Sequence, residues 1–421
     1  MKKLILISLF MVSSISHALT PTPADAQNKT IVYRNATIHV GDGQVIENGT
    51  LAFVNGKITR VGNFKDQWLE SDIDLKGKHI YPGFILPNTN LGISEIGSIK
   101  ATRDERETGQ NNANVRSIVA YNTDSEVTPT LKFNGIMLAQ PTPQGGLVSG
   151  LSSIVQLDAW NWEDAAIKVD DGIHVNWPNL MKGKFDFSTF TFKMEKNKNY
   201  NKQLNVIKSL FEDAKSKNHD VNLKLDAVIP VFDGSRKIYI HTDNSKSIIT
   251  AINYFKSLGL ENLVLITGQK IVPVIDFVKQ SGVPVIVASV HDLPDRQDSS
   301  VDAGYTTAIK LHNAGILVGL GYQGAMSARN LAFTAGTLVN YGMKKEQALK
   351  LITGNTAKIL GIDNNYGVLA KGKSATLFIT SGDALDMRTN ILDTAYIDGR
   401  NLNLAGRQQE LNERFLEKYK L

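Results

Sequence analysis

The middle of the chain alternates short, continuous apolar runs with longer segments of helical periodicity. Four such runs lie at 237–242, 262–267, 283–289 and 316–321, and each precedes a segment whose apolar residues recur every three or four positions. Strands that are buried on both faces of a parallel sheet read as uninterrupted Val, Ile and Leu. Repeated strand–helix units at this spacing predict an α/β fold with a parallel barrel or a doubly wound sheet. The segment 127–200 is less regular, and the pattern does not place every strand in it.

Both ends of the chain have a different pattern of apolar and polar residues from that of the middle. Residues 30–80 alternate apolar and polar positions, and Asn-Gly at 55–56 supplies the positive φ angles of a tight hairpin turn. The alternation returns at 374–380 and 390–406, where Asp-Gly at 398–399 predicts a second hairpin. We therefore expect an accessory sheet to which both ends of the chain contribute strands.

The first residues have the features of an export signal. Two lysines precede the apolar run 4–15, which is as long as the core of a signal peptide and too short for a membrane span. Small residues follow it at the positions that a signal peptidase reads. We expect a signal peptide at 1–18, with cleavage as late as residue 26, and a periplasmic or secreted protein. No later segment is apolar enough to predict a membrane span.

Composition excludes several classes of chemistry. The 421 residues carry 46 basic and 41 acidic side chains, a formal net charge of +5 that is too weak to predict nucleic-acid binding. The absence of cysteine excludes a lipoprotein anchor, disulfides and a cysteine nucleophile. We find no phosphate-binding or dinucleotide-binding loop, no nucleophile elbow and no HEXXH motif.

Four segments occur in an order and spacing that carry a family resemblance. They are IHVGDGQVIENGTLAFVNGKITRVG at 38–62, YPGFILPNTNLGISEIG at 81–97, TGNTAKILGIDNNYGVLAKGKSATLFI at 353–379 and DGR at 398–400. Together they resemble the amidohydrolase superfamily, in particular its exported branch similar to imidazolonepropionases.

The resemblance implies a domain organisation that agrees with the pattern of the chain. It implies a (β/α)8 TIM-like barrel at 81–364, flanked by a small β-sandwich built from both chain ends, 29–80 and 365–406. Residues 407–421 follow as an amphipathic C-terminal helix. We expect this helix to pack on the chain's own surface, and a dimer contact is the alternative.

The resemblance also implies where a metal centre would lie. Active members carry a His-X-His pair on the first barrel strand, a lysine or acid on the fourth, one histidine each on the fifth and sixth, and an aspartate on the eighth. These groups hold zinc or a similar divalent ion. The matching positions here are Asn88, Asn90, His241, Thr267 and Gln323, and the fourth-strand position is not placed.

The side chains at these positions are poor zinc ligands. A catalytic zinc needs three protein ligands, and neutral amide oxygens suit calcium better than zinc. One imidazole, His241, remains among the five matched positions. The sequence therefore predicts that the usual metal centre is absent and that no metal or other cofactor is bound.

Three histidines and one loop are further candidates. His241 is a metal ligand or a hydrogen-bonded barrel histidine, while His174 and His291 are additional pocket residues or structural ones. The segment 94–117 resembles the family's long first loop, which covers the barrel mouth. Its arginines, Arg103, Arg106 and Arg116, either form local ion pairs or bind the carboxylate of a ligand.

Three functional interpretations remain open. By resemblance, the chain is an exported hydrolase of carbon–nitrogen bonds in non-peptide or dipeptide substrates, although the replaced positions argue against metal-dependent activity. Alternatively, it is a pseudoenzyme: a non-catalytic ligand-binding or partner subunit of a metal-bearing paralogue. A metal-free hydrolase that uses His241 or His291 as base is the third interpretation. The partners expected are a small-molecule or peptide-like ligand and, in a homo-oligomer or heteromer, another chain.

Overall fold

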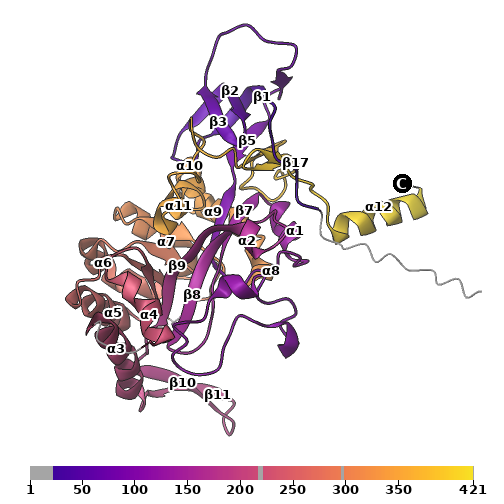
Figure 1. Ribbon diagram of the computed structural model, residues 1–421. Helices are drawn as coiled ribbons and strands as arrows, with labels where there is room; N and C mark the ends of the chain where they lie inside the picture. Colours follow the sequence, from indigo (N-terminus) through magenta and orange to yellow (C-terminus); the bar gives the residue numbers. More distant parts are fainter. Residues whose placement is uncertain (1–21, 217–220, 295–297, 421) are drawn as a thin grey trace, which may run out of the picture.

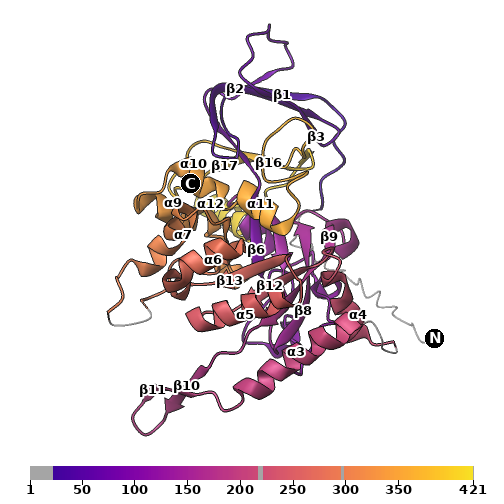
Figure 2. The same ribbon diagram turned by 90° about the vertical axis from the view of Figure 1, so that its left-hand side faces the viewer.

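The chain forms an eight-stranded barrel and a separate accessory sheet, shown in a computed structural model (Figures 1 and 2). The structure describes residues 22–216, 221–294 and 298–420. The predicted signal peptide at 1–18 lies outside the described residues. The predicted class, an α/β barrel flanked by a sheet from both chain ends, is confirmed.

The barrel strands follow the order β6-β7-β8-β9-β12-β13-β14-β15. Their bounds are β6 (Phe84–Thr89), β7 (Ile136–Pro141), β8 (Val148–Gln156), β9 (Ala166–Asn176), β12 (Lys237–His241), β13 (Leu263–Thr267), β14 (Val285–Val287) and β15 (Val318–Leu320). Neighbours are parallel except that β8 runs antiparallel to both β7 and β9. Only residues 142–147 join β7 to β8, too few for a parallel crossover, which needs at least about 10–12 residues. The short connection therefore forces the reversal.

Other backbone groups fill the gap between the first and last barrel strands. The N–H of Leu320 on β15 donates to the carbonyl of Leu351 at 3.2 Å, and the N–H of Ile85 on β6 donates to that of Ile352 at 2.9 Å. At the mouth, the Asn90 N–H donates directly to the Gln323 carbonyl at 2.8 Å. The ring of strands is thus closed by these bonds.

Helices cover the outside of the barrel. They are α1 (Thr128–Lys132), α2 (Trp162–Ala165), α3 (Tyr200–Ser216), α4 (Leu223–Val228), α5 (Ser245–Ser257), α6 (Ile275–Ser281), α7 (Ala303–Asn313), α8 (Ala325–Ala328), α9 (Leu331–Asn340), α10 (Lys345–Lys350) and α11 (Gly354–Leu360). Helix α5 shows how local sequence determines where such a helix begins and which face it buries. The Asn244 side chain caps its N-terminus by accepting from two backbone N–H groups, and its buried residues Ile248, Ala251, Ile252 and Phe255 follow the helical period.

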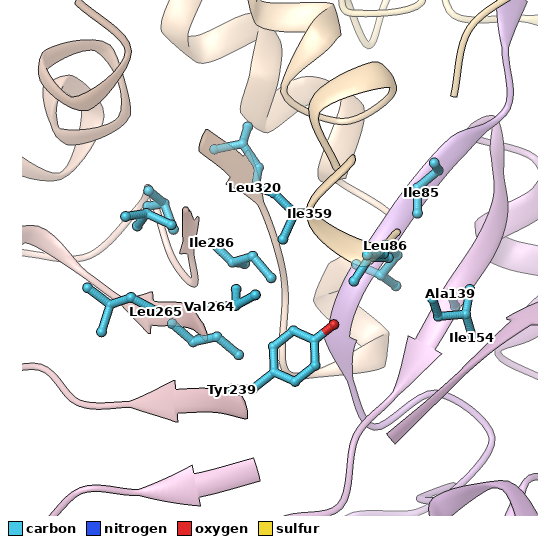
Figure 3. Close-up of a cluster of buried hydrophobic side chains, with 14 of the residues drawn as sticks. Ile85, Leu86, Ala139, Ile154, Tyr239, Val264, Leu265, Ile286, Leu320 and Ile359 are labelled. Carbon is cyan, nitrogen blue, oxygen red and sulfur yellow. The ribbon is translucent and has the colours of Figure 1, made fainter. Parts of the chain in front are cut away.

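The barrel interior is apolar and continuous with the helix layer. Figure 3 shows buried side chains of this core, among them Leu86, Val264 and Ile286. The ring of Tyr239 lies among them and is fully buried. Side chains therefore fill the barrel interior, and the loops at its carboxyl end surround a cavity above this core.

The accessory sheet combines strands from both ends of the chain, as expected. It has the order β18-β17-β16-β5-β1-β2-β3, with β4 beside β1, and is a single mixed sheet (Figure 1). The bounds are β1 (Ile31–His39), β2 (Val45–Val54), β3 (Lys57–Gly62), β4 (Ile73–Asp74), β5 (His79–Pro82), β16 (Leu377–Thr380), β17 (Leu392–Ile397) and β18 (Arg400–Asn401). Strand β5 pairs with both β1 and β16, so it joins the two ends of the chain.

Both predicted hairpin turns form and touch each other. The φ angles are 49° and 74° at Asn55 and Gly56, and 49° and 73° at Asp398 and Gly399, as a type I′ turn requires. A Cβ atom on Gly56 would lie 2.7 Å from the Asp398 carbonyl oxygen. Glycine at position 56 therefore serves both the turn and the close approach of the second turn.

The C-terminal helix differs from our expectation. Helix α12 (Arg407–Tyr419) extends away from the body, and none of its side chains is buried (Figure 1). Leu411, Phe415 and Tyr419 form an exposed stripe along it. The expected packing on the chain's own surface is thus absent in the structure. Within the described part of the chain, no helix has the length and apolarity needed to span a membrane.

Replacing Gly56 by alanine tests the contact between the two turns. We expect Gly56→Ala to lower the free energy of unfolding by about 2 kcal/mol or more, because a Cβ there adds a backbone clash to the cost of positive φ. Gly372→Ala is the matched control: its φ is 85°, but no atom lies within 4 Å of the added Cβ. Urea unfolding should show roughly 1 kcal/mol for the control. Equal losses would contradict the role of the contact.

Candidate functional site

A polar cavity of about 260 Å³ opens at the carboxyl ends of the barrel strands. Its walls are the loop 142–146 with Ser149, and side chains from three other parts of the barrel: Asn176 of β9, His241 of β12 and Gln323 after β15. Arg106 of the first long loop completes the lining. This is the end at which barrel proteins place their functional residues.

Two histidines form the best-defined contact at the site. His174 Nδ1 lies 2.8 Å from His241 Nε2, a hydrogen-bond distance. His174 is fully buried and its ring stacks on that of Tyr239, with centroids 4.6 Å apart. Burial lowers the pKa of His241 from 6.5 to about 4, and burial together with His241 lowers that of His174 well below 6.5. Both rings are therefore neutral at pH 7, and one of them donates to the other.

A network of buried polar side chains around Asp171 supports this histidine pair from inside the barrel. The Tyr239 hydroxyl donates to Asp171 Oδ2, and Gln140 Nε2 lies 3.3 Å from the same oxygen. Lys168 Nζ lies 2.5 Å from the other oxygen, Asp171 Oδ1. Burial and the adjacent Asp171 raise the pKa of Tyr239 well above 10. The hydroxyl therefore stays protonated, and its hydrogen bond fixes the ring on which His174 stacks.

The two asparagines hold the end of strand β6 by hydrogen bonds. Asn88 has a φ of 54°, a conformation that asparagine tolerates better than most residues, and its N–H donates to Gln140 Oε1 at 3.1 Å. Asn90 Oδ1 accepts from the Ala325 N–H at 2.8 Å. The amide oxygen of Asn90 thus binds the backbone of the loop after β15, two residues beyond Gln323.

The two remaining matched positions, Thr267 and Gln323, differ in their exposure to solvent. Thr267 is buried at the end of β13, and its Oγ1 has no hydrogen-bond partner among the described residues. Gln323 is exposed and lines the cavity. The Oδ1 of Asn88 and the Nε2 of His174 are likewise buried without a partner in the described part of the chain. Of the five matched positions, His241 and Gln323 line the cavity. Asn88, Asn90 and Thr267 are not part of its lining.

Asn176 occupies the fourth-strand position that sequence reasoning did not place. Strand pairing puts it directly opposite His241, and its Nδ2 donates to Gly146 O and Ser149 Oγ, both at 2.9 Å. In the sequence, this position is marked only by a polar residue at the end of GIHVN, residues 172–176. The pairing of β9 with β12 is needed to place it opposite His241. A neutral amide therefore fills this position too.

His291 belongs to a different part of the surface. Its Nε2 lies 3.0 Å from the Thr337 hydroxyl on α9, and it lines a cleft of about 580 Å³ next to the loop 383–388. This cleft shares no lining residue with the mouth cavity. Of the two additional histidines, the structure brings only His174 to His241.

The donor set does not fit the divalent ion that the resemblance implies. His241 Nε2 is engaged with His174, and the Asn90 oxygen is engaged with Ala325. Across residues 22–216, 221–294 and 298–420, no three His, Cys, Asp or Glu side chains are grouped so that they could hold a metal. Zinc binds through three or four such ligands, and the groups here are neutral amides and hydroxyls.

The three arginines of the first long loop differ in their contacts. Arg103 pairs with Glu105 at 2.7 Å, and Arg116 pairs with Asp170 at 2.9 Å. Arg106 is exposed at the cavity, and its side chain lies so close to Gly145 that a Cβ there would be 2.7 Å away. Its guanidinium is therefore the positive charge in an otherwise neutral polar lining.

Part of the chain matches a known family model, and its fold resembles solved structures. Residues 199–403 match the family model described as "Amidohydrolase family". The structure resembles an amidohydrolase from Thermotoga maritima MSB8, with a TM-score of 0.76 and 23% identity, over 89% of this chain and 99% of that one. No curated protein sequence matches the chain significantly.

More distant structures share the fold at lower similarity. Molinate hydrolase matches with a TM-score of 0.54 and 15% identity, over 90% of this chain and 95% of that one. A prolidase complexed with N-methylphosphonate-L-proline matches with a TM-score of 0.55 and 13% identity, over 89% of this chain and 100% of that one. These likenesses concern the fold.

The neutral histidine pair predicts a pH dependence of stability. Because the folded chain holds His174 and His241 below their ordinary pKa, the unfolded chain binds more protons below pH 6.5, so stability is present above pH 6.5 and falls as the pH approaches 4. We expect His241 alone to account for a loss on the order of 2 kcal/mol. Urea unfolding of the wild type and His241→Asn across this range would measure it. Identical slopes in both proteins would contradict the assignment.

Proposed function

We propose that this chain is an amidohydrolase-superfamily protein whose barrel mouth binds a small, carboxylate-bearing ligand without the metal-dependent hydrolysis of active members. By resemblance, the ligand class is a compound or dipeptide with a carbon–nitrogen bond. Its relation to the exported, imidazolonepropionase-like branch rests on the four sequence segments. Periplasmic or secreted location rests on the signal-like residues 1–18.

The hydrogen bond between His174 and His241 is the observation that carries the proposal. It occupies the Nε2 atom of the histidine that matches a metal-ligand position. The other matched side chains are Asn88, Asn90, Thr267 and Gln323, which offer no imidazole or carboxylate. A divalent ion lowers the pKa of a bound water to near 7, far below that of free water, so a site without the ion lacks most of the driving force for attack.

The residues present supply little general-base catalysis in place of a metal. A base works best with a pKa near the working pH. Burial lowers the pKa of His241 to about 4, so at neutral pH this side chain holds a proton too weakly to assist attack. His291 contacts Thr337 in the separate cleft, outside the mouth cavity. The metal-free hydrolase is therefore the weakest of the three interpretations.

Arg106 supports a ligand with a carboxylate. A guanidinium binds a carboxylate through two parallel hydrogen bonds, and here it adjoins the amides of Asn176 and Gln323 and the hydroxyl of Ser149. The other lining groups are neutral, so a ligand of one negative charge matches the charge of the cavity. The volume of about 260 Å³ suits a small molecule of dipeptide size.

A second candidate function is that of a partner subunit. The exposed stripe Leu411, Phe415 and Tyr419 on α12 supports it, because an isolated helix of this length is marginal in water and gains stability from packing. A paralogue with an intact metal centre would then supply the catalysis. Purification of the native complex and identification of its subunits would distinguish this role from that of a lone binding protein.

Metal content tests the absence of the catalytic centre. We expect less than about 0.1 ion per chain, unchanged by incubation with zinc or manganese, because functional sites hold such ions tightly. Mass spectrometry of protein purified without chelators measures it. One ion per chain in the wild type that is lost in His241→Ala would contradict the proposal. Hydrolysis of amides and dipeptides would then be the activity to measure.

Substitution of Arg106 tests the ligand class. We expect Arg106→Gln to weaken binding of alanyl-proline by about 10- to 100-fold, because a bidentate charge-assisted contact is lost. Binding of the carboxamide-capped dipeptide should not change. Calorimetric titration measures both ligands, and Arg103→Gln is the matched control because that arginine is paired with Glu105. Equal effects of the two substitutions would exclude Arg106 as the carboxylate contact.

A further inference from the structure

A two-stranded hairpin stands clear of the barrel beside its mouth. Strands β10 (Met181–Asp186) and β11 (Thr191–Lys196) pair only with each other (Figures 1 and 2). We call residues 181–196 the aromatic hairpin. An isolated two-stranded hairpin is marginally stable in water and usually gains stability by packing on another surface.

The two faces of the aromatic hairpin differ in polarity. Cross-strand pairing places Met181, Gly183, Phe185 and Met194 on one face. Lys182, Lys184, Asp186, Thr191, Lys193 and Glu195 lie on the other face. Its ion pairs, Lys182 with Glu195 and Lys193 with Asp186, hold this polar face together. Lys196, opposite Met181 at the open end, shares the apolar face, so the hairpin is amphipathic from its middle to its tip.

The turn at the tip presents two aromatic rings to solvent. Phe187 is 79% exposed and Phe190 is 80% exposed. Phe190 also has a φ of 50°, a conformation that is costly for a bulky side chain and easily adopted by glycine or asparagine. Phe185 supports the tip, with its ring centroid 4.9 Å from that of Phe187. Phe190 also lies edge-on to Phe185, with ring centroids 6.2 Å apart. Two rings so exposed, one of them in a strained conformation, point to a contact outside the chain.

The charge of this region selects the kind of surface that fits. Between residues 181 and 202 the chain carries six lysines and two carboxylates. Lysines on one face and aromatic side chains on the other are the pattern of elements that lie in the interface of an anionic membrane. A second copy of the same hairpin would bring like charges together, so charge favours a lipid surface over self-association.

We propose that the aromatic hairpin docks onto the surface of an anionic phospholipid bilayer. Phe187 and Phe190 enter the interfacial region, Phe185 and the methionines follow on the apolar face, and the lysines stay near the phosphates. The docking holds the barrel mouth close to the membrane surface. It is independent of the ligand and metal content of the mouth.

A single introduced cysteine tests the contact, since the natural chain has none. Ser188→Cys at the tip is labelled with a polarity-sensitive fluorophore and mixed with vesicles of phosphatidylcholine, alone or with an equal amount of phosphatidylglycerol. We expect a blue shift and an increase in emission only with the anionic vesicles, and weaker binding at high salt. The same label at Lys371→Cys, an exposed turn of the accessory sheet, should not respond.

Unlabelled variants distinguish binding by the two aromatic rings from binding by the fluorophore itself. We expect Phe187→Ser/Phe190→Ser to weaken co-sedimentation with anionic vesicles at least about fivefold, with an unchanged melting temperature, because both rings are exposed. Met387→Ser, exposed on another part of the surface, is the control. Equal binding of the variant and the wild type would overturn the proposal. Light scattering that shows a hairpin-dependent dimer without vesicle binding would overturn it in favour of a second copy.

Discussion

The barrel mouth depends on how the ring of strands closes between β6 and β15. These strands are not hydrogen-bonded neighbours over their length, and the carbonyls of Leu351 and Ile352 complete the ring between them. At the carboxyl end the closure is direct, through the Asn90 N–H and the Gln323 carbonyl. The Asn90 side chain adds a bond to the following loop. Amide hydrogen bonds thus hold the strand ends together at the mouth.

An ion pair and hydrogen bonds together support the mouth from inside the barrel. Asp171 is fully buried, yet Lys168 neutralises one of its oxygens while Tyr239 and Gln140 satisfy the other. A buried carboxylate without such partners would cost several kcal/mol. Its partners position the ring under His174, so the neutral histidine pair at the mouth is supported from below. The geometry of the mouth is thus supported by a network of buried side chains beneath it.

The sequence predicted those features that short stretches of chain determine. Continuous apolar runs identified the later barrel strands, and two Asx-Gly dipeptides identified the hairpin turns that bring the chain ends together. What it could not predict depends on contacts between distant residues. The reversal of β8 follows from a short connection within an irregular segment, and the place of Asn176 follows from strand register. The partner of His241, another histidine 67 positions away, was visible only in three dimensions.

The accessory sheet has a consequence for how the chain is made. The hydroxyls of Tyr33 and Tyr396, on strands of one sheet, meet across 363 positions of sequence. At a synthesis rate of about 5–20 residues per second, the N-terminal strands wait on the order of 20–70 seconds for their C-terminal partners. During that time β5 lacks its neighbour β16, and an open strand edge is a template for aggregation. The accessory sheet can therefore be completed only after the last strands of the chain have been made.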